Sequence, residues 1–146
     1  MSKLVQALLS GVFFTYILDF FLFLGIKLNY IDVYEIDLYY NILFADNQNI
    51  FIFSFLSIFI GYLVIYLQSN KIKFSIIGIM FILSFSTLIQ PIGHSVATMM
   101  LMQKNQTLKN SRHIFIGDIY YSGRKTITFY DYELQKMIIL DKKELI

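Results

Sequence analysis

The chain has 146 residues, of which 57% are hydrophobic and only 15% are charged, whereas an ordinary soluble domain contains about 25% charged residues. This composition excludes a disordered chain and a water-soluble globule of this size, and it predicts an integral membrane protein. The net charge of +2 is too small to predict nucleic-acid binding, and the absence of cysteine excludes disulfides and thiolate metal sites.

The first apolar segment runs from Leu4 to Ile26 and contains one charged residue, Asp19. It is longer than the apolar core of a cleavable signal peptide, which has about 7–15 residues. We therefore expect a retained transmembrane helix over residues 4–26. Residues 28–49 are acidic and rich in tyrosine, a residue that favours the membrane surface because its ring is apolar and its hydroxyl group is polar. This stretch predicts an interfacial loop.

Two further apolar segments follow and are separated by the polar turn 68–73. Residues 50–67 and 74–102 have no formal charge, and each has about the length that a membrane span needs. We expect them to form the second and third transmembrane helices, arranged as an antiparallel hairpin. Because proline removes a backbone donor and clashes with the carbonyl group four residues earlier, we expect a kink at Pro91, with added backbone freedom at Gly93.

Small residues in these two segments predict close contacts between helices. Ser57 and Gly61 are four residues apart and therefore share one face of the second expected helix. Gly78 provides a small site on the third. Since small side chains allow membrane helices to approach closely, we expect all three residues at helix contacts.

The remainder of the chain has a different pattern. Residues 103–111 are polar and predict a connector, whereas residues 112–146 alternate β-branched or aromatic residues with polar ones. That alternation predicts a small antiparallel β meander of three strands outside the membrane. The expected fold class is thus a membrane α-helical protein, with three transmembrane helices in residues 1–102 and a small C-terminal β-rich domain.

Asp19 requires a partner, because an isolated carboxyl group near the middle of a spanning helix costs about 2.5–3.5 kcal/mol on insertion scales. At about 1.5 Å per residue, Ser54 and Gln90 reach nearly the depth of Asp19 in the membrane. His94 follows Gln90 by one helical turn on the same face. We therefore expect an intramembrane polar cluster of these four residues. Two interpretations stay open: a proton relay or ion site made by Asp19 and His94, or a structural role for Asp19 in helix packing.

Catalytic and metal-binding motifs are not complete anywhere in the sequence. Zinc and iron sites need three or four ligands, and the only histidines are His94 and His113. A haem shared with another subunit stays open, because His94 is available as an axial ligand. The prediction is a protein that is not an enzyme and has neither a metal nor a cofactor of its own.

These features favour a non-catalytic accessory, assembly or modulating subunit of a larger bacterial inner-membrane complex. Its helices are expected to pack against other integral membrane subunits in the lipid bilayer, and its β-rich domain to dock on a partner. The alternative is a small homo-oligomeric ion or proton channel or transporter that uses Asp19 and His94. Lys71 and Lys73 in the turn between the second and third spans favour a cytoplasmic N-terminus and an extracytoplasmic C-terminal domain.

Overall fold

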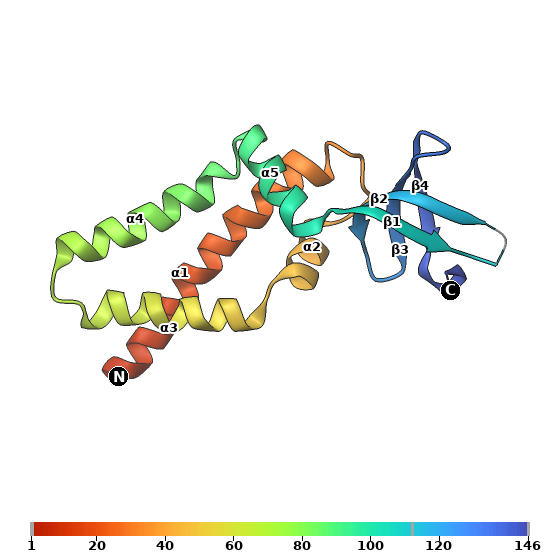
Figure 1. Cartoon of the computed structure of the whole chain (residues 1–146). Coiled ribbons are helices and arrows are strands. Elements are labelled where there is room, and N and C mark those ends of the chain that lie inside the picture. The colour runs from red at the N-terminus through yellow and green to blue at the C-terminus, as the bar shows by residue number, and fades with distance from the viewer. Residues whose placement is uncertain (1, 112, 146) are drawn as a thin grey trace.

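The computed structural model describes residues 2–111 and 113–145 as a helical half joined to a sheet (Figure 1). The helices are α1 (Lys3–Ile26), the π-helical turn η1 (Lys27–Ile31), α2 (Tyr40–Asn47), α3 (Ile50–Tyr66), α4 (Asn70–Ser86), α5 (Gln90–Leu101) and the 3-10 helix η2 (Lys142–Glu144). The strands are β1 (Gln103–Lys109), β2 (Ile114–Ser122), β3 (Thr126–Asp131) and β4 (Lys136–Asp141). Arg112, the expected start of the β-rich domain, lies outside the described residues, as do Met1 and Ile146.

One helix of the described chain, and not three, is by itself long and apolar enough to cross a membrane. It comprises α1 and η1, which continue from Lys3 to Ile31 over 29 residues. The prediction of three transmembrane helices is therefore wrong. α3 and α4 have 17 residues each, fewer than the about 20 that a spanning helix needs. They reach that length only in combination with α2 and α5, from which they are bent by 86° and 88°.

The break between α4 and α5 explains why residues 74–102 do not form one kinked helix. α4 ends at Ser86, and Pro91 lies in the first turn of α5. The missing amide of proline costs nothing in a first turn, and its fixed φ suits a helix start, so Pro91 begins a helix here. Gly93 allows the chain to fold back closely, because a Cβ atom on it would lie 2.1 Å from the carbonyl oxygen of Thr87.

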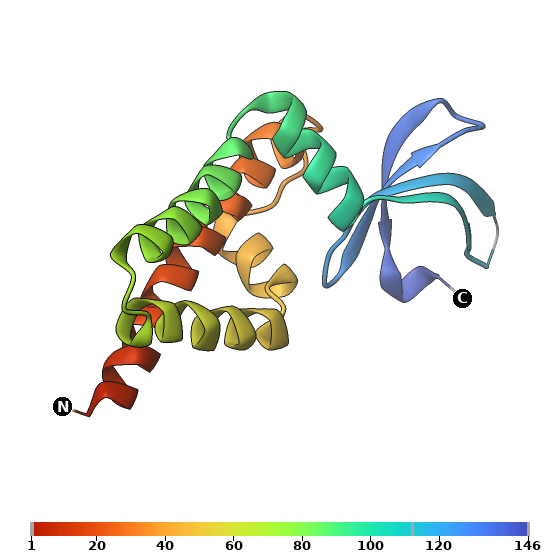
Figure 2. The ribbon, with the colours of Figure 1, turned by 60° about the vertical axis from the view of Figure 1, so that its left-hand side comes forward.

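α1 is the central helix of the helical half (Figures 1 and 2). α3 crosses it at a backbone contact: a Cβ atom on Gly11 would lie 1.8 Å from the carbonyl oxygen of Ser57, and one on Gly61 would lie 2.1 Å from that of Ala7. α3 and α4 diverge from their connection, and each packs mainly on α1 (Figure 1). The expected antiparallel hairpin is therefore splayed open, because α1 provides the packing surface for both helices.

The sheet is an antiparallel meander in the order β1-β2-β3-β4, with one strand more than predicted. The additional strand, β1, replaces most of the expected polar connector 103–111. Its side chains do not alternate between polar and apolar, because it forms an edge of the sheet and is mostly exposed. Ile119, Ile127 and Phe129 form a small core on one face of the sheet.

The larger core lies where the end of α1 meets α2, α5 and the sheet. Tyr30 and Ile31 in η1, Leu43 in α2 and Ala97 in α5 are fully buried there. Tyr121 in β2 belongs to the same buried cluster. The sheet is thus fixed to the end of α1 through side-chain packing as well as through the chain connection.

Candidate functional site

Four rings meet between the end of α1, α5 and β2, and we call them the tyrosine–histidine junction: Tyr30, Tyr34, His94 and Tyr120. The Tyr34 hydroxyl oxygen lies 2.9 Å from Nε2 of His94. The Tyr30 hydroxyl donates a hydrogen bond of 3.0 Å to the backbone carbonyl of Tyr120. The rings of Tyr34 and Tyr120 meet edge to face with centroids 4.5 Å apart, a geometry that the charge distribution of aromatic rings favours. These contacts join three separate segments of the chain.

The π-helical turn η1 positions the two tyrosines of the junction that follow α1. The amides of Asp32 and Ile36 bond to carbonyl groups five residues earlier, those of Lys27 and Ile31. This wider turn rotates the end of α1, and such turns are frequent at functional sites. Glu35 then has a φ of 53°, a left-handed conformation that ends the helical path. The chain consequently leaves the helix next to the sheet.

The junction continues along a row of tyrosines on the sheet. The ring of Tyr130 lies 6.4 Å from that of Tyr120 and 6.3 Å from that of Tyr132, measured between centroids. The Tyr132 hydroxyl donates to Oδ1 of Asp118 at 2.6 Å, and the backbone amide of Asn105 donates to the same oxygen at 2.9 Å. The Asp118 bond raises the pKa of Tyr132, and burial raises the pKa of Tyr120. Both shifts favour the neutral phenol.

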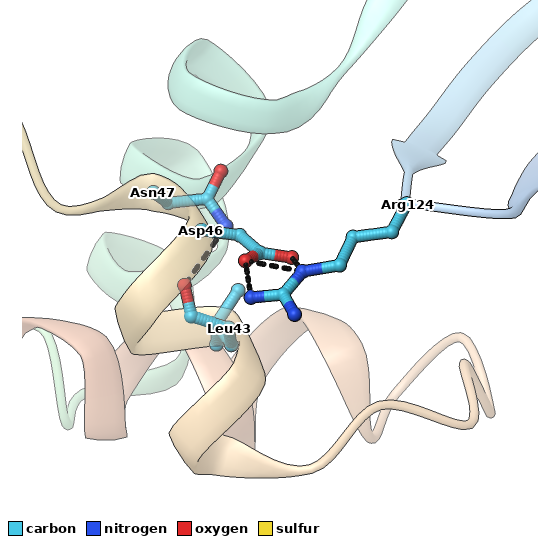
Figure 3. Close-up of polar contacts among 4 residues, drawn as sticks. All are labelled: Leu43, Asp46, Asn47 and Arg124. Carbon is cyan, nitrogen blue, oxygen red and sulfur yellow. Dashed lines mark hydrogen bonds and ion pairs between the residues drawn. The ribbon is translucent and has the colours of Figure 1, made fainter.

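An ion pair makes a second connection between the two halves of the molecule (Figure 3). The guanidinium group of Arg124, in the turn after β2, binds the carboxylate of Asp46 in α2 through Nε, at 2.9 and 3.0 Å, and through Nη2. Asp46 raises the pKa of Arg124. The pair is largely exposed on the arginine side, so it contributes more to the orientation of the turn than to stability.

The turn between α4 and α5 is held against α1 by polar contacts. The side-chain amide of Asn29 donates to the backbone carbonyl of Thr87 at 2.8 Å. The Thr87 hydroxyl lies 3.2 Å from the carbonyl oxygen of Phe21. Gly25 makes room for this turn, because a Cβ atom on it would lie 2.3 Å from Oγ1 of Thr87. Sequence reasoning missed the contacts of Asn29 and Thr87; the available signal was a polar residue just after the first apolar segment and a hydroxyl residue four positions before Pro91.

Asp19 lies half-buried on α1 and is held by one residue of the following polar turn. The side-chain amide of Gln48 donates to Oδ2 of Asp19 at 2.9 Å. The other carboxylate oxygen, Oδ1, has no hydrogen-bond donor within residues 2–111 and 113–145. Asp19 thus has half of its accepting capacity available to another molecule.

An apolar groove of about 450 Å³ opens beside this carboxylate and is lined by α1, α3, α4 and α5, and we call it the Asp19 groove. Its apolar walls include Leu18, Leu22, Leu83 and Ile92. The hydroxyl groups that line it donate to backbone carbonyls within the protein: Ser84 to Leu18, Ser86 to Leu83 and Thr87 to Ser84. Asp19 is therefore the acceptor that this part of the described structure presents to a partner.

The four residues of the expected polar cluster lie on separate networks. Asp19 bonds to Gln48 and His94 bonds to Tyr34, whereas Ser54 and Gln90 have exposed side chains. No hydrogen bond joins any two of the four in the described parts of the chain. The bends at both ends of the α3–α4 unit remove the parallel alignment of spans on which the depth estimate depended.

The residues expected at helix contacts divide into two groups. Ser57 and Gly61 lie at the crossing of α3 with α1. Gly78 on α4 has open space around it, with no atom within 4 Å of the position that a Cβ would take. Ser57 and Gly61 are therefore contact residues of the α1–α3 pair, and Gly78 lies on a free face of α4.

Few of the side chains that acid–base catalysis or metal binding needs lie close together in the described structure. No group of three or more histidine, aspartate or glutamate side chains gathers among the described residues. The hydroxyls of Tyr30 and Tyr34 in the tyrosine–histidine junction bond to neighbouring protein groups. The Asp19 groove is consequently the candidate functional site, because it combines an apolar concavity with an available acceptor on the long apolar helix.

The fold and site define a class of protein with one long apolar helix, a bent helical hairpin packed on it, and a four-stranded sheet fixed to its end. Comparison of the chain with known proteins finds no matching family model, no matching curated protein and no matching solved structure.

Proposed function

We propose that the protein is a non-catalytic accessory subunit of a bacterial inner-membrane complex, anchored by α1 and engaged with other integral membrane subunits. The observation that carries this proposal is the uncovered apolar surface of the helical hairpin. Phe51 on α3 and Phe74 and Ile82 on α4 leave 83%, 69% and 69% of their surfaces exposed. Further large apolar side chains are exposed along both helices, among them Phe55 and Ile58 on α3 and Ile79 and Leu83 on α4, and extensive exposed apolar surface marks a contact with protein or membrane.

Because α3 and α4 are short, protein is favoured over lipid as part of what covers their exposed apolar surfaces. A helix of 17 residues is about 25 Å long, which is less than the about 30 Å of the bilayer core. If the hairpin enters the membrane beside α1, at least one end of each helix lies within the core. Backbone groups at such ends are tolerated only where protein or a water-filled cavity covers them. A neighbouring subunit supplies that cover.

The rigid attachment of the sheet supports the same role. The tyrosine–histidine junction and the Asp46–Arg124 pair hold the sheet at the end of the helical half. A partner bound to the helices therefore acquires a sheet in a defined position next to the membrane. A docking or assembly subunit needs such a fixed surface.

The test is affinity purification of the tagged full-length chain from its own membranes in mild detergent, followed by mass spectrometry. We expect other integral membrane proteins in a fixed ratio to the tagged chain. A matched preparation of Phe51→Ser and Phe74→Ser, which place polar groups on the exposed apolar faces, is expected to lose them. Purification of the wild-type chain as a lone monomer contradicts the proposal.

The channel alternative predicts a different result. It requires Asp19 and His94 on one path, and the described structure assigns them to separate networks. A channel predicts that Asp19→Asn abolishes proton or ion flux in liposomes and leaves assembly intact. An accessory subunit predicts no proton or ion flux for the wild-type chain or for Asp19→Asn.

A further inference from the structure

We propose that the Asp19 groove binds a transmembrane helix of another subunit, and that this helix carries a lysine or arginine at the depth of Asp19. The inference rests on the proposed function and specifies the chemistry of the partner. Its basis is the combination of an apolar groove, one available carboxylate oxygen and the absence of lysine and arginine from residues 4–26, 50–70 and 74–103.

The groove suits an aliphatic helix along most of its length. Leu18 and Leu22 come from α1, Leu83 from α4, and Ile92 and Val96 from α5. With Leu56 from α3, four helices form its walls, and the backbone of the turn between α4 and α5 is fixed against α1 by Asn29. A groove with fixed walls needs little reorganisation when a partner binds.

The carboxylate determines what the partner must carry. Gln48 satisfies only Oδ2 of Asp19, and the groove hydroxyls are already bonded to backbone carbonyls. Charged side chains within membrane segments are costly unless they pair with one another or with backbone groups. A lysine or arginine opposite Asp19 offsets this cost and donates to Oδ1.

A second copy of the chain lacks the required cation. Residues 4–26, 50–70 and 74–103 contain no lysine or arginine. Lys27, at the end of α1, is paired with Asp32. Parallel copies of α1 would place Asp19 opposite Asp19, which is unfavourable for two charged carboxylates.

Lipid headgroups are too distant to supply the cation. Asp19 follows Lys3 by 16 residues and precedes Ile31 by 12, distances of roughly 24 and 18 Å at about 1.5 Å per residue. Asp19 is therefore near the middle of the long helix, whereas lipid amines lie at the membrane surface. A cation carried by a transmembrane helix reaches this depth.

The experiment measures binding of synthetic transmembrane helices to the full-length chain in phosphatidylcholine vesicles by energy transfer. The probes are three leucine-rich peptides of about 20 residues, identical except for lysine, leucine or glutamate at the centre. We expect the lysine peptide to bind the wild-type chain at least about tenfold more tightly than the leucine peptide. Asp19→Asn keeps an oxygen acceptor for Gln48 and is expected to abolish the preference, whereas Asp37→Asn, outside the groove, is expected to retain it.

Three results overturn the inference. They are equal binding of the lysine and leucine peptides, binding of the glutamate peptide as tight as that of the lysine peptide, and energy transfer between two labelled copies of the chain together with no binding of the lysine peptide. The last result assigns the groove to a second copy. If the peptides show no preference while native partners still co-purify, the inference fails and the accessory role stands. If no partner co-purifies but the lysine preference depends on Asp19, the accessory role fails and the groove assignment stands.

Discussion

The hydrogen bond between Tyr34 and His94 joins the segment after α1 to α5, and both residues are half-buried. A typical hydrogen bond of this kind contributes about 0.5–1.5 kcal/mol to stability. We predict that Tyr34→Phe lowers the free energy of unfolding of the full chain in detergent micelles by that amount, as measured by denaturant titration. Tyr39→Phe is the matched control, because its ring is 72% exposed. Equal effects of the two substitutions would contradict the assignment.

The raised pKa values of the tyrosines in the sheet predict a loss of stability at alkaline pH. Burial raises the pKa of Tyr120 and of Tyr121, and the Asp118 bond raises that of Tyr132. Since the folded-state pKa exceeds the unfolded value of about 10, the stabilisation is complete below that pH and is lost as the pH rises through the folded-state pKa. We expect the unfolding temperature to fall in that range. The absorbance of tyrosinate, followed as the pH is raised, shows which tyrosines titrate first. Tyr121→Phe is expected to remove absorbance from the part of the titration at the highest pH. Loss of absorbance from the part at lower pH would contradict this prediction.

At the scale of elements, the crossing of α1 and α3 depends on two glycines. A methyl group on Gly11 would meet the backbone of Ser57, and one on Gly61 would meet the backbone of Ala7, so the helices must separate to accept it. We predict that Gly11→Ala and Gly61→Ala each destabilise the full chain by about 1–3 kcal/mol. Thermal unfolding in detergent measures the effect.

Gly78 on α4 provides the control for this prediction, because nothing lies within 4 Å of its Cβ position. Gly78→Ala is expected to be neutral or to stabilise α4 by up to about 1 kcal/mol, since alanine favours a helix more than glycine does. A destabilisation by Gly78→Ala as large as that by Gly11→Ala would show that helix propensity, and not the crossing, controls the result.

At the scale of the whole molecule, the N-terminus and the α3–α4 connection lie toward one end, and the sheet lies at the other (Figures 1 and 2). The first end carries Lys3, Lys71 and Lys73. Short loops rich in lysine and arginine stay in the cytoplasm, so Lys71 and Lys73 favour a cytoplasmic position for this end, whereas Lys104 and Lys109 in β1 favour the opposite orientation. We keep the prediction that α1 crosses the inner membrane once, with this end in the cytoplasm and the sheet outside, and test it directly.

Single cysteines test this orientation cleanly, because the chain has none of its own. A membrane-impermeant thiol reagent applied to spheroplasts is expected to label Ser122→Cys, and to label Ser2→Cys and Asn70→Cys only after lysis. All three positions are exposed in the structure. Labelling of Ser2→Cys in intact spheroplasts reverses the orientation, and labelling of Asn70→Cys alone places the hairpin connection on the outer side.

Local patterns were sufficient for several elements. The apolar segment 4–26 corresponds to α1, and 50–67 corresponds to α3 to within one residue. Alternation of apolar and polar residues located the three strands β2, β3 and β4. These features are readable from the sequence because a continuous apolar run and a period-two pattern depend on neighbouring residues alone. Docking of the β-rich domain on a partner stays a prediction; within the chain, Tyr121 packs in the core at the end of α1.

By itself, then, the sequence determined the apolar character of the chain, the ends of its first helix and three of its strands. The tertiary structure decided whether Pro91 kinks a helix or begins one, because contacts of Thr87 with Asn29 and Phe21 hold the turn before it. It also decided the pairing of β1, whose exposed polar residues have no strand pattern of their own. The partners of Asp19 and His94 are distant in sequence, since hydrogen bonds depend on the path of the whole chain and local spacing does not specify it.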